Sequence, residues 1–359
     1  MDSRKKGRGA KLLKKVDIKS MTLPRLEAYC IQQGLPKFRA GQIFGWLHQK
    51  GAASFEEMSS LPAELRKRLS ESCEIPSIAI RRKLVSKIDG TIKYLYEFAD
   101  GQTVESVLMQ YRHGYSLCIS TQVGCRMGCR FCASTLLGLE RSLTPAEMLG
   151  EVYMAGKDSG QKISSVVLMG IGEPLDNFEN VMDFLEILSS PQGINLSLRH
   201  VSLSTCGLVD GIYRLMERKL QLTLSISLHA PNDEIRSRTM PVNNKYPMDE
   251  LLSACRDYFR QTGRRISFEY ALIEGVNDTP SCAQQLCRKL EGLSAHVNLI
   301  PVNPVKERNF QRSSRERVRQ FQKILEQHHI NATVRRELGS DINAACGQLR
   351  RDDKGGKSC

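Results

Sequence analysis

The chain has 359 residues, of which 41% are hydrophobic, so it can bury one large core and leave length for a small accessory domain. Its formal net charge of +13 favours a polyanionic partner, because Lys and Arg placed on phosphates release condensed counterions. The sequence holds no long apolar run, and its first residues, MDSRKKGRGAKLLKK, lack the apolar centre of a signal peptide. We therefore expect a cytoplasmic protein that does not bind a membrane.

The chain has twelve cysteines, and their use also depends on the compartment. Without an export signal, a reducing compartment favours metal binding or catalysis over structural disulfides. Some of these cysteines lie in helical patterns among apolar neighbours, where a free thiol packs as a small hydrophobe. We expect no function for Cys30, Cys255 and Cys287.

The N-terminal part of the chain is first basic and then helical. Residues 1–20 are rich in Lys and Arg and have little to bury, which predicts a flexible basic arm. Residues 21–78 follow a helical pattern with stops at Gly34 and Gly51, and Leu61-Pro62 opens a further helix. This segment predicts a small helical accessory domain.

A short β-rich segment follows at residues 79–110. Its three runs are separated by Asp89-Gly90 and Asp100-Gly101, dipeptides that favour hairpin turns. The pattern predicts a β-meander that links the helical domain to the rest of the chain.

Residues 111–349 alternate strand runs with helical stretches, which favours parallel strands joined by crossover helices. Polar residues or glycines end nearly every run, as they do at the active-site mouth of a barrel. The sequence therefore predicts an α/β fold, an incomplete (β/α)6 barrel, with residues 350–359 as a disordered tail. The six runs are SLCIST, SSVVLMG, HVSLST, LTLSISLH, RISFEYALIEG and HVNLIPVN.

Three cysteines, Cys125, Cys129 and Cys132, lie between the first of these runs and the helix TPAEMLGEVY, which opens with a capping box. A structural zinc site is normally closed by four ligands, whereas three thiolates on an iron–sulfur cube leave one iron free. Phe131 would cover such a cluster. The alternative is zinc with a distant fourth cysteine, such as Cys118 or Cys206.

The motif C-x3-C-x2-C after a first strand, followed by Gly172-Glu173-Pro174 and six strand–helix repeats, resembles the radical S-adenosylmethionine (SAM) superfamily. The resemblance implies a [4Fe–4S] cluster on the three cysteines, with SAM bound to the open iron. In this superfamily the cluster's electron cleaves SAM to a 5′-deoxyadenosyl radical, and the protein positions the reactants. Glu173 would accept hydrogen bonds from the SAM amino group.

A closer resemblance extends from about residue 23 to residue 349, where the chain is similar to the RlmN family of radical SAM enzymes that methylate carbon 2 of adenine. Several matching segments are longer than six residues, and all follow the family's order. They are KFRAGQIFGWLHQKG, GQTVESV, CISTQVGCRMGCRFC, MGIGEPLDN, LSTCG, SISLHAPND, NLIPVNP and DINAACGQL.

The family pattern implies the SAM-binding residues. Each matching position lies at or just beyond the end of a predicted strand, where a barrel places its ligand contacts. These positions are Gly172, Glu173, Ser204, Ser227, Leu228, His229 and Asn303.

The family also implies three catalytic residues. Carbon 2 of adenine is electron-poor and does not attack the SAM methyl group directly, so two SAM molecules serve each turnover. One methylates the residue that matches Cys346, and the other supplies a radical that activates that methyl group. The residue that matches Cys118 then attacks Cys346 to form a transient disulfide, as thiolate exchange allows. Glu105 matches the base that removes the carbon-2 proton.

The implied substrates are 23S ribosomal RNA and an adenine in the tRNA anticodon loop, and an electron donor such as flavodoxin or ferredoxin is implied as well. We expect a monomer. The target base must leave its stack to enter the barrel mouth. Basic residues that follow strand ends or adjoin Cys346 are candidates for phosphate binding: Arg236, Arg238, Lys245, Lys306, Arg308, Arg312, Arg335 and Arg336.

Two other functions remain open at this stage. The related Cfr resistance enzymes use the same machinery on carbon 8, and Pro174 favours carbon 2 because that group typically has Ala there. A zinc-stabilised RNA-binding protein without catalysis is the alternative from another class.

Overall fold

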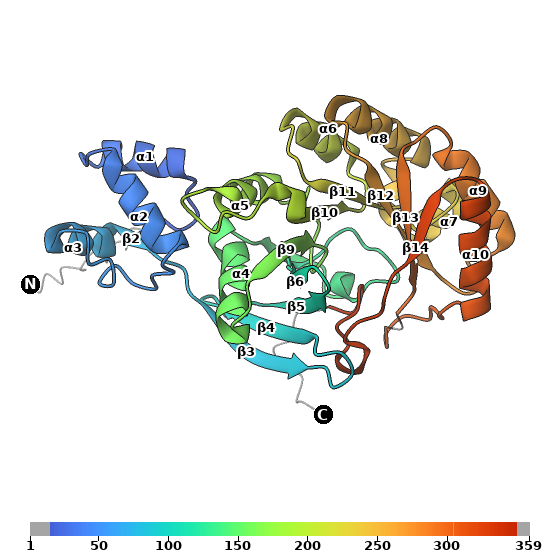
Figure 1. Ribbon diagram of the computed structural model, residues 1–359, viewed down its shortest axis with the longest axis horizontal. Helices are drawn as coiled ribbons and strands as arrows, with labels where there is room; N and C mark the ends of the chain where they lie inside the picture. The colour runs from blue at the N-terminus through green and yellow to red at the C-terminus, as the bar shows by residue number, and fades with distance from the viewer. Residues whose placement is uncertain (1–14, 304, 350–359) are drawn as a thin grey trace, which may run out of the picture.

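The computed structural model of the chain describes residues 15–303 and 305–349. Residues 1–14 of the predicted arm and the whole predicted tail, 350–359, lie outside this range. Within it, a helical unit precedes a large α/β unit (Figure 1). No helix of the described residues is long and apolar enough to cross a membrane.

The helical unit contains α1 (Leu23–Gln32), α2 (Phe38–His48) and α3 (Ala63–Ser72). A small parallel pair, β1 (Val16–Asp17) and β2 (Cys73–Glu74), closes the unit. Residues 16–20 differ from the predicted arm, because β1 pairs with β2 and Ile18 is fully buried. One apolar position and a two-residue strand are too weak a pattern to stand out from the basic sequence before them.

The α/β unit is built on one ten-stranded sheet with the order β14-β13-β12-β11-β10-β9-β6-β5-β4-β3. The strands from β6 to β14 are parallel, and β5, β4 and β3 continue the sheet antiparallel. Their bounds are β3 (Ile78–Val85), β4 (Ile92–Phe98), β5 (Thr103–Tyr111), β6 (Gly114–Cys118), β9 (Ile163–Leu168), β10 (Val201–Thr205), β11 (Thr223–Ser227), β12 (Ile266–Leu272), β13 (Ala295–Pro301) and β14 (Asn331–Val334).

This sheet confirms the predicted incomplete α/β barrel and adds to it. The six predicted parallel strands are present, and β14 is a seventh at the edge. The meander is part of the same sheet, since β5 pairs with β6, where the sequence predicted a separate link. Both edges, β14 and β3, remain unpaired within the described sheet, so the barrel is open between them.

Helices cover the outside of the sheet (Figure 1). They are α4 (Pro145–Ser159), α5 (Phe178–Ser189), α6 (Val209–Glu217), α7 (Asp233–Thr239), α8 (Met248–Thr262), α9 (Pro280–Leu290) and α10 (Arg315–Gln327). Helix α4 begins as predicted: Thr144 accepts a hydrogen bond from Glu147 N–H, and the Glu147 carboxylate accepts one from Thr144 N–H. This capping box fixes where the chain leaves the three-cysteine loop.

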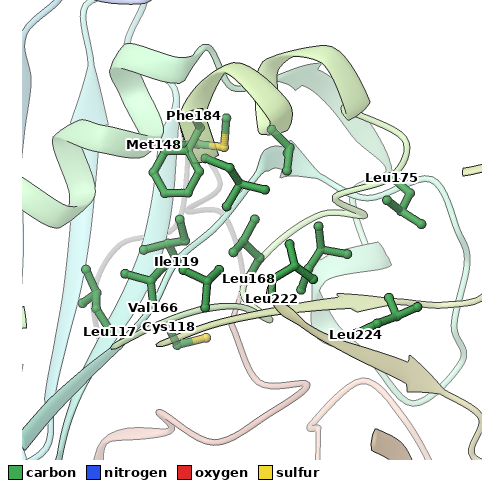
Figure 2. Close-up of a cluster of buried hydrophobic side chains, with 14 of the residues drawn as sticks. Leu117, Cys118, Ile119, Met148, Val166, Leu168, Leu175, Phe184, Leu222 and Leu224 are labelled. Atoms are coloured by element: carbon green, nitrogen blue, oxygen red, sulfur yellow. The ribbon is translucent and has the colours of Figure 1, made fainter. Parts of the chain in front are cut away.

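Strand alternation separates the core from the interior of the barrel. Figure 2 shows Leu117 of β6, and Ile119 just after this strand, among apolar residues that include Met148 of α4 and Phe184 of α5. Cys118, between them in the sequence, has the opposite direction, because successive side chains of a strand point to opposite faces. The helix-side layer is therefore apolar and the inner face carries the thiol.

Polar contacts join the helical unit to α4 and α5. Ser20 Oγ accepts a hydrogen bond from Ala146 N–H at 3.0 Å, and Arg25 forms an ion pair with Asp183. His48 Nδ1 and the Tyr153 hydroxyl are 2.8 Å apart in a buried part of this interface. Burial lowers the pKa of His48 to about 3.

This buried histidine predicts a pH dependence of stability. Below the ordinary histidine pKa of about 6.5, His48 is protonated in the unfolded chain but stays neutral in the folded protein. Stability therefore falls as the pH drops. Between pH 6.5 and 5.5 the free energy of unfolding should fall by about 1 kcal/mol more in the wild type than in His48→Gln, because the unfolded histidine is already half protonated at pH 6.5. Urea denaturation at several pH values measures this difference, and equal slopes for the two proteins would contradict it.

Candidate active site

Two adjoining cavities open at the carboxyl ends of the parallel strands. The large cavity, of about 960 Å³, contains the three motif cysteines and the strand-end residues. Its lining includes Cys125, Cys129, Phe131, Cys132, Gly172, Glu173, Ser204, Cys206, Ser227, His229, Glu269 and Asn303. The smaller one, here called the thiol cavity, is lined by Val107, Met109, Cys118 and residues 344–346, among others. Met169, Ile300, Asn303, Arg335 and Cys346 line both.

The three-cysteine loop is held by its own backbone. It connects β7 (Gln122–Gly124) to β8 (Leu139–Ser142), a short antiparallel pair that the sequence did not predict. Cys125 N–H donates to the Gly138 carbonyl at 3.1 Å. The Thr135 hydroxyl donates to the carbonyls of Cys129 and Cys132 at 3.1 and 3.0 Å. These bonds turn the three thiols toward one cavity.

The thiols fit an iron–sulfur cube better than a single ion. In residues 15–303 and 305–349, no three His, Cys, Asp or Glu side chains are close enough to hold one metal ion directly. A four-iron cube spreads its ligands further apart than one ion does, so thiols that share a cavity without meeting at a point suit it. Burial raises the pKa of all three thiols, so loading of metal must release their protons.

Gly124, just before Cys125, has a φ of +80°, and a Cβ there would lie 1.8 Å from the Gly138 carbonyl oxygen. We expect Gly124→Ala to cost about 3 kcal/mol of stability and to abolish iron binding, since the loop must move. Gly34 is the matched control: its φ is +70°, and a Cβ added there would have no atom within 4 Å. Gly34→Ala should cost only about 1 kcal/mol. Denaturant unfolding and iron analysis test both, and iron retained by Gly124→Ala would contradict the prediction.

Glu173 is fixed in the loop that follows β9. Its carboxylate accepts hydrogen bonds from Leu175 N–H at 3.0 Å and Cys206 N–H at 2.7 Å. Burial raises the pKa of this carboxyl, and the two N–H groups oppose that shift. A carboxylate has about four acceptor positions, so Glu173 can accept further hydrogen bonds from a ligand amine.

His229 is held as a neutral donor. Its Nδ1 accepts a hydrogen bond from Ala271 N–H at 2.8 Å, which leaves Nε2 to carry the proton. Burial, together with the nearby Arg236 cation, lowers the pKa of this imidazole to about 3. The Phe131 ring meets the His229 ring edge-on at 4.9 Å, so the aromatic predicted to cover the cluster lies in the cavity wall.

The other predicted SAM contacts divide into two groups. Ser204 and Ser227 face each other with hydroxyl oxygens 3.4 Å apart, and both line the large cavity. Leu228 is different: its side chain is fully buried in the core and does not line either cavity. Its backbone N–H donates to the Glu269 carbonyl at 3.1 Å, so any contact it makes with a ligand is indirect.

Cys346 is brought to the cavities by residues 338–349, here called the strap. Near its start, Gly339 N–H donates to Asp89 at 2.9 Å, and Asp341 accepts from Lys87 N–H at 2.9 Å. At its far end, the Gly347 carbonyl accepts from Ala133 N–H at 2.8 Å. The strap therefore crosses the open side of the barrel and joins the β3–β4 turn to the three-cysteine loop.

Cys118 and Cys346, about 230 residues apart in the printed sequence, line the same thiol cavity. Both are free thiols. The pKa of Cys118 is raised to about 12, mainly by burial and in part by neighbouring Cys346, while Arg335 opposes the rise. The Cys118 thiol is therefore protonated near neutral pH in this structure.

Glu105 is close to this cavity but not in its lining. It lies in β5 with Val107 and Met109, which do line the thiol cavity, at the two-residue spacing that shares one face. Its side chain is 4% exposed, with Oε1 3.1 Å from Lys93 Nζ.

The candidate phosphate ligands are not all on the surface. Arg236 is fully buried and donates to the Cys206 carbonyl at 2.6 Å and the Leu228 carbonyl at 3.2 Å, so the prediction that it binds phosphate is wrong. It instead braces two strand ends. Arg335 lines both cavities with a guanidinium nitrogen 3.8 Å from Glu269. The other predicted phosphate ligands remain candidates: Arg238, Lys245, Lys306, Arg308, Arg312 and Arg336.

Sequence reasoning missed Glu269. Its carboxylate lies in the large cavity, where Asn298 and Ser267 donate to it at 2.7 and 3.0 Å. The signal was a lone acidic residue inside the apolar run RISFEYAL.

Family models and similar proteins both relate this chain to RNA methyltransferases of the radical SAM superfamily. Residues 16–75 match the model of the ribosomal RNA large subunit methyltransferase N-terminal domain, and residues 119–280 match that of the radical SAM superfamily. A protein from Lachnoclostridium phytofermentans, described as a probable dual-specificity RNA methyltransferase RlmN, is 52% identical over 95% of this chain and 96% of its own. One from Pelotomaculum thermopropionicum with the same description is 52% identical over 94% and 92%.

A solved structure agrees with these relatives. The crystal structure of a radical SAM methyltransferase from Sphaerobacter thermophilus is 44% identical and superposes with a TM-score of 0.88. The match covers 93% of this chain and 99% of that one.

Proposed function

The chain belongs to the RlmN family of radical SAM methyltransferases, and on that premise we propose that it methylates carbon 2 of adenine in ribosomal RNA and in transfer RNA. The observation that carries the proposal is the position of Cys346. This thiol lines both the large cavity, with the three motif cysteines, and the thiol cavity, with Cys118. A residue that receives a methyl group in one place and passes it to a base in another requires access to both.

The large cavity is proposed to hold the cofactors. Cys125, Cys129 and Cys132 would hold a [4Fe–4S] cluster, and Gly172, Glu173, Ser204, Ser227, His229 and Asn303 would contact SAM. Bound there, the cluster and SAM supply a methyl group and a 5′-deoxyadenosyl radical. Glu173 would accept a hydrogen bond from the ammonium group of SAM, and neutral His229 would donate one through Nε2. The Phe131 ring, which packs against His229, would help to exclude water.

The thiol cavity is proposed to hold the adenine. Glu105 takes the proton from carbon 2 of the base that is attached through its new carbon to Cys346. Cys118 sulfur then bonds to Cys346 sulfur, and the bond between Cys346 sulfur and the new carbon breaks. The electron pair of the broken bond stays on that carbon, which gains a proton. The protein is left as a disulfide that an external thiol must reduce. Cys118 must first lose its proton, because burial keeps its pKa near 12.

The family relationship does not favour the carbon-8 alternative, since the curated relatives are described as RlmN. It also replaces the non-catalytic zinc alternative, because residues 119–280 match the model of the radical SAM superfamily. We further propose 23S ribosomal RNA and the tRNA anticodon loop as the substrates and a flavodoxin or ferredoxin as the electron donor. A cytoplasmic monomer fits this role.

Deletion of the gene followed by complementation tests the proposal. Mass spectrometry of digested ribosomal and transfer RNA should show 2-methyladenosine in the wild type and none in the deletion strain. The wild-type gene should restore it, whereas a gene that encodes Cys129→Ala should not. Loss of 8-methyladenosine, or 2-methyladenosine that persists in the deletion strain, would refute the proposed reaction.

A further inference from the structure

A buried lysine lies where the strap meets the sheet. Lys93 of β4 has a side chain only 10% exposed, and its Nζ is 3.1 Å from Glu105 Oε1. The same Nζ donates a hydrogen bond to the Asn343 carbonyl at 3.1 Å. Burial of an ammonium group is costly unless it is paired, so both partners help to hold this cation in the interior.

Both partners of Lys93 belong to the proposed chemistry. Glu105 shares a strand face with Val107 and Met109 of the thiol cavity, and Asn343 precedes Cys346 by three residues in the strap. A cation that touches both therefore fixes the Glu105 carboxylate relative to the segment that carries the thiol.

We infer that Lys93 is a positioning residue, which holds the Glu105 carboxylate aimed at the base attached to Cys346. The inference rests on the proposed function. Without the ammonium group, the buried Glu105 carboxylate loses the ion pair that fixes its position. A misplaced Glu105 does not take a proton from carbon 2.

The strap does not depend on Lys93 alone. Asp89 and Lys87 hold it near its start, and Ala133 holds it beyond Cys346. Loss of the Lys93 ammonium should therefore leave Cys346 near the large cavity and impair only the later step. This predicts a separation between methylation of Cys346 and methylation of RNA.

Four variants test the inference in the reconstituted full-length protein: Lys93→Met, Lys93→Arg, Glu105→Gln and the control Lys83→Met. Lys83 lies in the same hairpin but pairs with Asp158, 2.6 Å away, and lines neither cavity. In Lys93→Met, the single-turnover rate of 2-methyladenosine formation should fall at least about tenfold, while Cys346 methylation by SAM stays within about twofold of wild type. Lys93→Arg, which keeps the charge, should recover most of the rate, and Lys83→Met should match wild type.

A double-mutant cycle gives a readout that does not need activity. Lys93→Met should lower the urea midpoint of unfolding more than the double variant Lys93→Met/Glu105→Gln, because the single change leaves a buried carboxylate without its cation. Additive effects would show that the two side chains are not coupled and would overturn the inference.

The single-turnover rates give two further outcomes that would overturn the inference. A wild-type rate in Lys93→Met would show that Lys93 has no role. Equal losses of rate in Lys93→Met and Lys93→Arg would show a role in packing alone. If the wild type makes no 2-methyladenosine, the proposed function fails, and the unfolding cycle still decides whether Lys93 and Glu105 act as a pair.

Discussion

Replacement of Cys346 by alanine should reduce methylation of RNA by at least about a thousandfold, because in the proposed reaction this thiol carries the methyl group to the base. Among the described residues, Cys346 is the one cysteine that lines both cavities. Iron content and reductive cleavage of SAM should stay near wild type, since the three motif cysteines and the SAM-facing residues are unchanged. Incorporation of label from methyl-labelled SAM into RNA, with cleavage of SAM measured in parallel, separates the two activities.

A matched control for this variant is Cys287→Ala. Cys287 is buried in α9 and lines neither cavity, so its loss should leave the rate within about twofold of wild type. Methylation by Cys346→Ala within about tenfold of wild type would show that the methyl group takes another route.

Replacement of Cys118 by alanine should trap RNA on the protein. In the proposed reaction the base becomes attached through Cys346 and is released by Cys118 sulfur, so without Cys118 product formation should fall about a hundredfold or more while a covalent adduct accumulates. The adduct should survive denaturation, appear as a shifted band on a denaturing gel and map by mass spectrometry to the peptide that contains Cys346.

Cys206→Ala is the control for trapping, because Cys206 lines the large cavity and not the thiol cavity. It should give no adduct. The double variant Cys118→Ala/Cys346→Ala should give none either. If Cys118→Ala turns over without an adduct, Cys118 is not the resolving thiol.

The strands of the barrel were predictable because each is a buried run bounded by polar residues or glycine, a pattern that depends only on neighbours in the chain. β14 was not predicted, because four residues, NATV, three of them exposed, hardly differ from a loop. The β7–β8 hairpin was missed for a similar reason: its strands have three and four residues and depend on pairing with each other.

The residues of the site were found mainly by resemblance to a family, and spacing alone does not place them. Nothing local to Cys118 or Cys346 indicates that the strap brings them together. Arg236 shows the opposite limit, since an arginine after a strand end resembles a surface residue until the carbonyls that surround it are known. Lys93 is similar, because its role depends on Asn343, 250 residues further along the chain.

The strap also sets an order in time. It follows every strand of the described chain, and a chain folds from its N-terminal side while it is being synthesised. The sheet and the three-cysteine loop are therefore made before the segment that carries Cys346. On the proposed reaction, a chain still on the ribosome is therefore unable to become attached to RNA until the strap, residues 338–349, has been made.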